Sequence, residues 1–242
     1  MYSKVLSCAL HGVEGRLITV ECDVSDGLPM FNMVGFLASE VRESSDRVRT
    51  AVKNSGYRMQ AQRVTINLSP ADIRKEGAAF DLPISIALLA AFGYIPKEKL
   101  QDVLLIGELS LNGDIRPVKG ILSIVDFAKK NGVKVIIIAG DMFDKKNISV
   151  KAKKIVKNQI ILNPEIDFLY LKGNHDEINF IEEEEEIPSN LKLFNEKEWV
   201  TYKYGDIVIT GIEIGKQNNY NIYNSLILEK NDINIVVMHG QE

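Results

Sequence analysis

Three short polar motifs in the second half of the chain hold residue types that bind metals and transfer protons. They are Gly140-Asp141-Met-Phe-Asp144, Gly173-Asn174-His175-Asp176 and His239-Gly240. Asp supplies an anionic oxygen, Asn a neutral oxygen and His an imidazole nitrogen, a mixture that suits manganese, iron or zinc better than calcium. We therefore expect Asp141, Asn174 and His239 to bind a divalent metal, with manganese as the first choice.

Each motif follows an apolar run that is typical of a buried strand, at residues 134–140, 167–171 and 233–238. Functional sites in open parallel sheets gather at the carboxyl ends of the strands, so we expect three strands to deliver the ligands to one rim. His175 would lie beside the metal, where it could protonate a leaving alkoxide while Asp176 orients its ring.

The first half of the chain alternates between strand and helix patterns, which is typical of an α/β or α+β fold. A helix is predicted over 39–54 with Ser39 as its cap, and a buried helix over 82–92 with Asp81 as its cap. The predicted strands are 17–25, 64–68, 103–109 and 115–118, the last two joined through Asn112-Gly113.

Several sequence segments in this half resemble the N-terminal domain of the ComM/YifB, or Mg-chelatase-like, family. They are Gly27-Leu-Pro-Met-Phe-Asn-Met-Val-Gly35, Val41-Arg-Glu-Ser-Ser-Asp-Arg-Val-Arg49, Asn67-Leu-Ser-Pro-Ala-Asp-Ile-Arg-Lys-Glu-Gly77, Phe80-Asp-Leu-Pro83 and Gly107-Glu-Leu-Ser-Leu-Asn-Gly113. The resemblance covers about residues 1–138 and implies a Lon-protease-like (ribosomal-S5-like) fold. In that family the domain precedes an AAA+ ATPase linked to DNA branch migration, so the implied partners are DNA or DNA-uptake proteins.

Neither peptidase nor ATPase activity is expected from this half. Lon-type proteases use a Ser–Lys dyad, and alignment through Gly107-Glu108 places Asp81 and Leu122 at those two positions. Leucine cannot act as a base, and a carboxylate is a poor nucleophile for acyl transfer. The 242 residues also contain no Gly-x-x-x-x-Gly-Lys-Ser/Thr phosphate loop.

The second half resembles the calcineurin-like metallophosphoesterases, and its Ala-Gly-Asp-x-Phe-Asp motif is most similar to the SbcD/exonuclease type. The resemblance implies that Asp141 bridges two metal ions and that Asn174 and His239 bind the second ion. It further implies that His175 is the general acid with Asp176 as its partner, and that Asp144 contacts the metal ligands without binding the metal itself. The implied substrate is a phosphoester.

This half also departs from the family pattern. The family's Asp-x-His motif is absent, and the chain stops three residues after His239, before a Gly-His-x-His motif. We therefore expect a partial domain with an incomplete site, holding one ion or none, that is inactive alone. Two alternatives stay open: an active phosphoesterase or nuclease that is completed by oligomerisation or a partner, and a chimeric chain without native activity.

Composition supports two segments, 1–138 and 139–242, with different histories. Residues 1–140 carry 17 Lys and Arg against 15 Asp and Glu, whereas residues 141–242 carry 12 against 18. The net charge of −4 argues against a broadly basic nucleic-acid-binding surface. We expect a cytoplasmic protein without a membrane span, because only two cysteines occur and no apolar run approaches about 18 residues.

Overall fold

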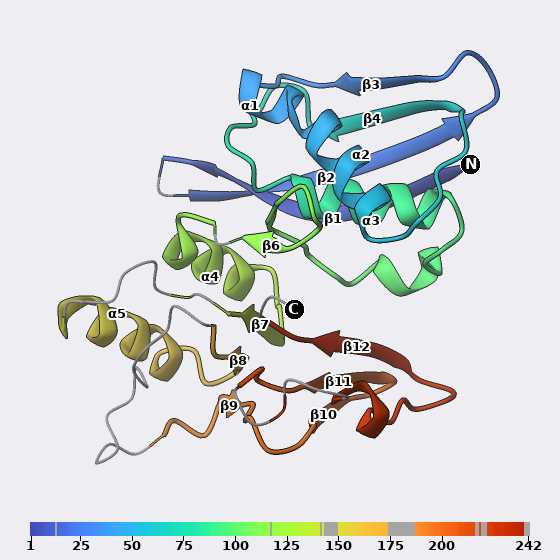
Figure 1. Cartoon of the computed structure of the whole chain (residues 1–242). Coiled ribbons are helices and arrows are strands. Elements are labelled where there is room, and N and C mark those ends of the chain that lie inside the picture. The colour runs from blue at the N-terminus through green and yellow to red at the C-terminus, as the bar shows by residue number, and fades with distance from the viewer. Residues whose placement is uncertain are drawn as a thin grey trace. The chain divides into compact units, whose positions relative to one another are not determined.

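The computed structural model describes residues 1–12, 14–116, 118–140, 142, 150–173, 187–215, 218 and 222–239. The chain divides into two compact units, Met1–Phe127 and Ala128–Glu242 (Figure 1). Both units combine helices with sheets, which confirms the mixed α/β expectation. Within the described residues, no helix combines the length and apolar character that crossing a membrane requires.

The first unit is built on one four-stranded sheet in the order β1-β2-β4-β3. Its strands are β1 (Tyr2–His11), β2 (Glu14–Ser25), β3 (Met30–Val34) and β4 (Arg63–Ser69). The pairs β1–β2 and β2–β4 are antiparallel, whereas β3 runs parallel to β4. Val64, Ile66 and Leu68 alternate with more exposed residues along β4, so one face of the sheet forms the core.

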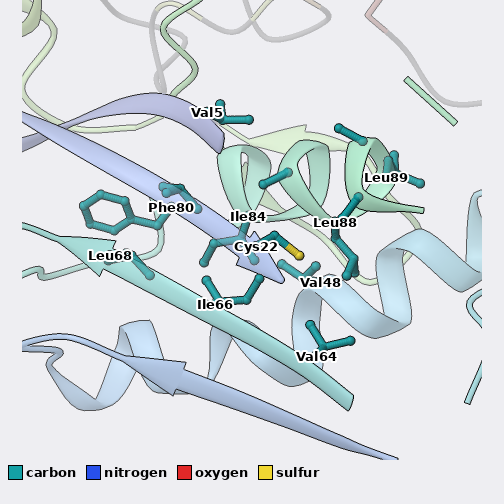
Figure 2. Close-up of a cluster of buried hydrophobic side chains, with 14 of the residues drawn as sticks. Val5, Cys22, Val48, Val64, Ile66, Leu68, Phe80, Ile84, Leu88 and Leu89 are labelled. Carbon is teal, nitrogen blue, oxygen red and sulfur yellow. The ribbon is translucent and has the colours of Figure 1, made fainter. Parts of the chain in front are cut away.

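Helices α2 (Ser44–Asn54) and α3 (Asp81–Ala91) supply the rest of this core. Figure 2 shows Ile84 and Leu88 of α3 packed with Ile66 and Cys22 of the sheet. The helix α3 buries residues on nearly every side, as its uniformly apolar sequence predicts.

Both predicted helix caps are wrong. The expected helix over 39–54 is divided at Glu43 into α1 (Ser39–Arg42) and α2, and Ala38 rather than Ser39 is the N-cap of α1. Asp81 is the first residue of α3 and caps nothing. Its two carboxylate oxygens instead accept hydrogen bonds from Arg47 of α2, at 2.7 Å from Nε and 3.1 Å from Nη2. A tertiary ion pair therefore replaces the local capping contact.

The predicted strand over 103–109 is also mostly wrong. Only β5 (Glu108–Leu109) is regular, and it pairs with β6 (Ile115–Arg116) across the expected turn. The backbone before β5 is satisfied by two separate partners, because Leu105 N–H donates to Leu6 of β1 and Gly107 N–H donates to Ala79. Without one continuous partner strand, residues 103–107 form no ladder. The 3₁₀ helix η1 (Lys97–Leu100) and α4 (Ile121–Lys130) complete the elements up to residue 130.

In the described residues of the second unit, the strands form two three-stranded sheets, in the orders β7-β8-β9 and β10-β11-β12. Their elements are β7 (Val135–Ala139), α5 (Val150–Ile161), β8 (Asp167–Leu171), β9 (Leu191–Leu193), β10 (Val200–Tyr204), β11 (Ile207–Gly211), η2 (Ile222–Ser225) and β12 (Ile233–Val237). The strands expected at 134–140, 167–171 and 233–238 are confirmed as β7, β8 and β12. The first sheet is parallel throughout.

The two sheets of this unit share one hydrophobic core. Leu169 and Leu171 of β8 cluster with Ile209 of β11 and Val237 of β12. The domain boundary expected after residue 138 falls within β7, which pairs with β8 of the second unit. The two-domain division at that residue stays a prediction.

We predict that Arg47→Met lowers the free energy of unfolding of the first unit by about 3–5 kcal/mol, because it leaves the Asp81 carboxylate buried without its cation. Asp81 is 0% exposed. Urea unfolding at pH 7 followed by far-UV circular dichroism measures the change. Trp199, the only tryptophan of the chain, lies in the second unit, and its fluorescence reports that unit separately.

The matched control is Arg16→Met, since Arg16 pairs with Glu14 on the surface, where the two side chains are 55% and 64% exposed. This variant is expected to change stability by less than about 1 kcal/mol. Equal losses in the two variants would show that burial of Asp81 does not govern the cost.

Candidate metal centre

The first two motif-bearing strands end side by side. The strands β7 and β8 are in parallel register, with Ala139 opposite Leu171. The ladder extends one residue further, because Gly140 N–H donates to Leu171 O at 2.9 Å. The residues that follow in sequence, Asp141 after Gly140 and Asn174 after Gly173, are therefore connected to neighbouring strand ends.

The third strand ends at the same place although it belongs to the other sheet. His239 follows β12, and its ring Nδ1 lies 3.2 Å from the carbonyl oxygen of Ala139, the last residue of β7. Within its own sheet, β12 stays joined to the end of β11, since Ile212 N–H donates to Val237 O at 3.4 Å. The carboxyl ends of β7, β8 and β12 thus meet at one rim, as the sequence pattern predicts.

Gly140 makes this meeting sterically feasible. Its φ is +84°, in the left-handed region that L residues with a side chain rarely occupy. A Cβ atom at this position would lie 2.1 Å from His239 Nδ1 and 2.2 Å from its Cγ. The imidazole therefore occupies the space that any other residue's side chain would fill.

The contact with Ala139 also determines how the His239 ring carries its proton. A carbonyl oxygen can only accept a hydrogen bond, so Nδ1 must be the protonated nitrogen in this contact. In the neutral ring, Nε2 then carries the lone pair. Metal-binding histidines commonly donate one ring nitrogen to a backbone carbonyl in this way. His239 is thus held in the way that metal-binding histidines are held.

One acidic residue at this rim was not predicted from the sequence. Glu213 follows β11, and its Oε1 accepts a hydrogen bond from Lys172 N–H at 3.2 Å, just after β8. Its own N–H donates to Asn195 O at 2.9 Å, which anchors its backbone. Glu213 belongs to no recognisable motif, but it follows an apolar strand in the same way as Asp141 and His239. That positional rule, applied to residues 207–211, could have found it.

The other predicted site residues, Asp141, Asp144, Asn174, His175 and Asp176, lie outside the described residues. Their roles as ligands, acid and supporting groups therefore stay predictions, and His239 is the one site residue that the structure places. Among the described residues there is no group of three or more His, Cys, Asp or Glu side chains arranged to hold a metal.

The chain matches two protein families along its length. Residues 20–141 match the family described as subunit ChlI of Mg-chelatase, and residues 112–242 match the calcineurin-like phosphoesterases. Each match spans half of the chain or more. The chain therefore belongs to the ChlI family through its first half and to the calcineurin-like phosphoesterase family through its second.

Individual relatives match the first half. The uncharacterized protein YifB of Escherichia coli is 49% identical over 135 residues, which are 56% of this chain and 27% of YifB. Competence protein ComM of Haemophilus influenzae is 41% identical over 133 residues, 55% of this chain and 26% of ComM. Lon protease 1 of Hydrogenovibrio crunogenus is 23% identical over 142 residues, 56% of this chain and 17% of the protease. The chain thus spans about a quarter or less of the length of these relatives.

We predict that Gly140→Ala destabilises the second unit more than Gly205→Ala does. Both glycines have positive φ, +84° and +63°, so both variants bear a similar backbone strain. Only at Gly140 does the new methyl group collide with a ring, because nothing lies within 4 Å of a Cβ at Gly205. The additional loss is expected to be about 1–3 kcal/mol, the usual cost of overpacking.

Urea unfolding followed by Trp199 fluorescence measures both variants. The NMR chemical shifts of the His239 ring protons test the cause. They are expected to change in Gly140→Ala and to match wild type in Gly205→Ala. Equal destabilisation of the two variants would contradict the close packing of His239 on Gly140.

Proposed function

We propose that the second unit binds a single divalent metal ion, preferably manganese, at the rim formed by β7, β8 and β12. We further propose that this site binds phosphoesters but has little or no turnover in this chain alone. The observation that supports the proposal is the His239 ring, which packs on Gly140 and bonds Ala139 O through Nδ1. This contact orients an imidazole next to the residue that precedes Asp141.

The proposed ligands are Asp141, Asn174 and His239. A bound ion would withdraw charge from the phosphoryl oxygens and hold the ester against the strand ends. His175 would give its proton to the leaving alkoxide, and Asp176 would keep the imidazole of His175 in the donating orientation. Asp144 would support the ligands without binding the metal.

Low turnover is expected because phosphoester hydrolysis of this kind uses two metal ions and the chain lacks ligands for one of them. A two-metal clamp stabilises the attacking and the leaving oxygen with one ion each. The chain contains no Asp-x-His motif, so a first ion would keep Asp141 as its only family ligand. One ion is enough to bind the ester, whereas fast hydrolysis requires the missing partner ion.

For the first unit we propose an accessory role in DNA processing in the cytoplasm, without an ATPase of its own. The likeness to competence protein ComM supports this role. So does the charge pattern, since residues 47–71 contain five basic residues and no acidic residue. The buried cysteines Cys8 and Cys22 are free thiols, in agreement with a reducing compartment.

Calorimetric titration of the full chain with MnCl₂ tests the metal site. We predict binding of one ion per chain, weakened at least about tenfold in His239→Ala because one ligand and its second-sphere contact are lost. His11→Ala is the matched control, because His11 lies at the end of β1 in the first unit. The same affinity in wild type and His239→Ala would refute the site.

A separate assay tests turnover. With bis-p-nitrophenyl phosphate and Mn²⁺, we predict no hydrolysis above the rate of the metal alone. Hydrolysis that disappears in His175→Ala would contradict the inactive assignment. If that active protein also held two ions per chain in an oligomer, completion of the site by a second copy would replace our proposal.

A further inference from the structure

The helices α2 and α3 of the first unit end in the same local motif. Gly56 and Gly93 follow the two helices with φ of +85° and +83°. Each glycine is followed by a tyrosine, Tyr57 or Tyr94, whose N–H donates to a carbonyl five residues earlier, at 3.2 and 2.9 Å. This is the Schellman ending, in which the left-handed glycine turns the chain back across the last helical turn. It presents one tyrosine at the end of each helix.

The two tyrosine rings form a fixed and accessible pair. Their centroids are 5.1 Å apart and their planes are inclined by 68°, an edge-to-face contact. The Tyr94 hydroxyl donates to Arg58 O at 2.8 Å, which restrains that ring. Tyr57 is nevertheless 41% exposed and Tyr94 is 47% exposed. The pair therefore offers aromatic surface to a partner without reorganisation.

The charged side chains along the adjoining segments are mostly basic. Lys53 in the last turn of α2, Arg58 next to Tyr57, and Lys97 of η1 are all exposed. Glu98 is the only acidic residue in the sequence between 82 and 101, and Lys97 and Lys99 stand on both sides of it. The two segments that carry the rings, 53–62 and 93–101, thus each have a net positive charge.

We propose that Tyr57 and Tyr94 form a stacking platform for single-stranded nucleic acid, with Lys53, Arg58 and Lys97 contacting the phosphates. Every base has a flat face that stacks on an aromatic ring, and neighbouring cations follow the backbone of the strand. A duplex keeps its bases stacked inside and cannot use the rings. An acidic peptide would use the cations but would bring no base to each ring. This inference rests on the DNA-processing role proposed for the first unit, and it names the surface that would bind the DNA.

Fluorescence anisotropy of the full chain with a labelled 15-nucleotide oligo(dT) tests the platform. Tyr57→Ala and Tyr94→Ala are each expected to weaken binding by about 5- to 150-fold, the range found for loss of one stacked base. Tyr57→Phe and Tyr94→Phe keep the aromatic face and are expected to retain binding within about threefold of wild type. Tyr223→Ala is the control, because Tyr223 is a 56% exposed tyrosine of the second unit.

The charges are tested in the same assay by varying NaCl. Wild type is expected to lose affinity steeply between 50 and 200 mM salt, and the double variant Lys53→Gln/Arg58→Gln is expected to have a shallower dependence, by about 1.4 in the slope of log affinity against log salt. Circular dichroism of each variant confirms that the fold is retained. A duplex of the same length is expected to bind more weakly than oligo(dT) and to be insensitive to both alanine substitutions.

Three results would overturn the proposal. If wild type binds oligo(dT) and neither alanine variant weakens it, the platform is wrong while a DNA role survives. If polyglutamate displaces oligo(dT) and its own binding needs the cations but not the rings, the surface is a site for acidic peptides. If wild type binds neither oligo(dT) nor the duplex, both the platform and the DNA-processing role fail.

Discussion

The missing side chain at Gly140 is the constraint on which the rim of the second unit depends. The residue closes the β7–β8 ladder through its own N–H and adopts a φ of +84°. It also leaves room for the ring that approaches from β12 in the other sheet. Any Cβ would have to displace His239 or the strand end. Gly140 thus leaves the space for the imidazole, and the Ala139 carbonyl contacts its Nδ1.

The first unit shows how a fold can keep its framework while the chemistry at one position changes. Asp81 lies at the position where the alignment with Lon-type proteases expects a nucleophilic serine. Its carboxylate is fully buried and bound by Arg47, and that hydrogen bond raises the pKa of Arg47 above its ordinary value. Leu109 N–H adds a contact at 3.3 Å. A carboxylate held by three donors connects helices and a strand, and it is not available to attack an acyl group.

Sequence reasoning succeeded where the information is local and failed where a distant partner decides. The apolar runs at 134–140, 167–171 and 233–238 predict β7, β8 and β12, because short runs of β-branched, aromatic or leucine residues followed by a polar motif favour a buried strand. The cap at Asp81 failed, since Arg47 is remote in sequence and binds the Asp81 carboxylate. The cap at Ser39 failed because α1 begins at Ser39 itself, whose hydroxyl contacts Glu40 instead. Glu213 belongs to no motif, and only its position after the strand β11 could have indicated that it reaches Lys172 N–H.

The two family matches overlap over residues 112–141, so both of them include β7. Its five apolar residues do not decide the matter, because a buried strand in either family would accept them. The residue after β7 does decide it. A glycine with positive φ, facing a histidine from β12, is needed only by the rim of the second unit. The pairing of β7 with β8 agrees with that assignment. The contacts at the strand end and the pairing with β8 therefore place β7 in the second compact unit, while both family matches cover it.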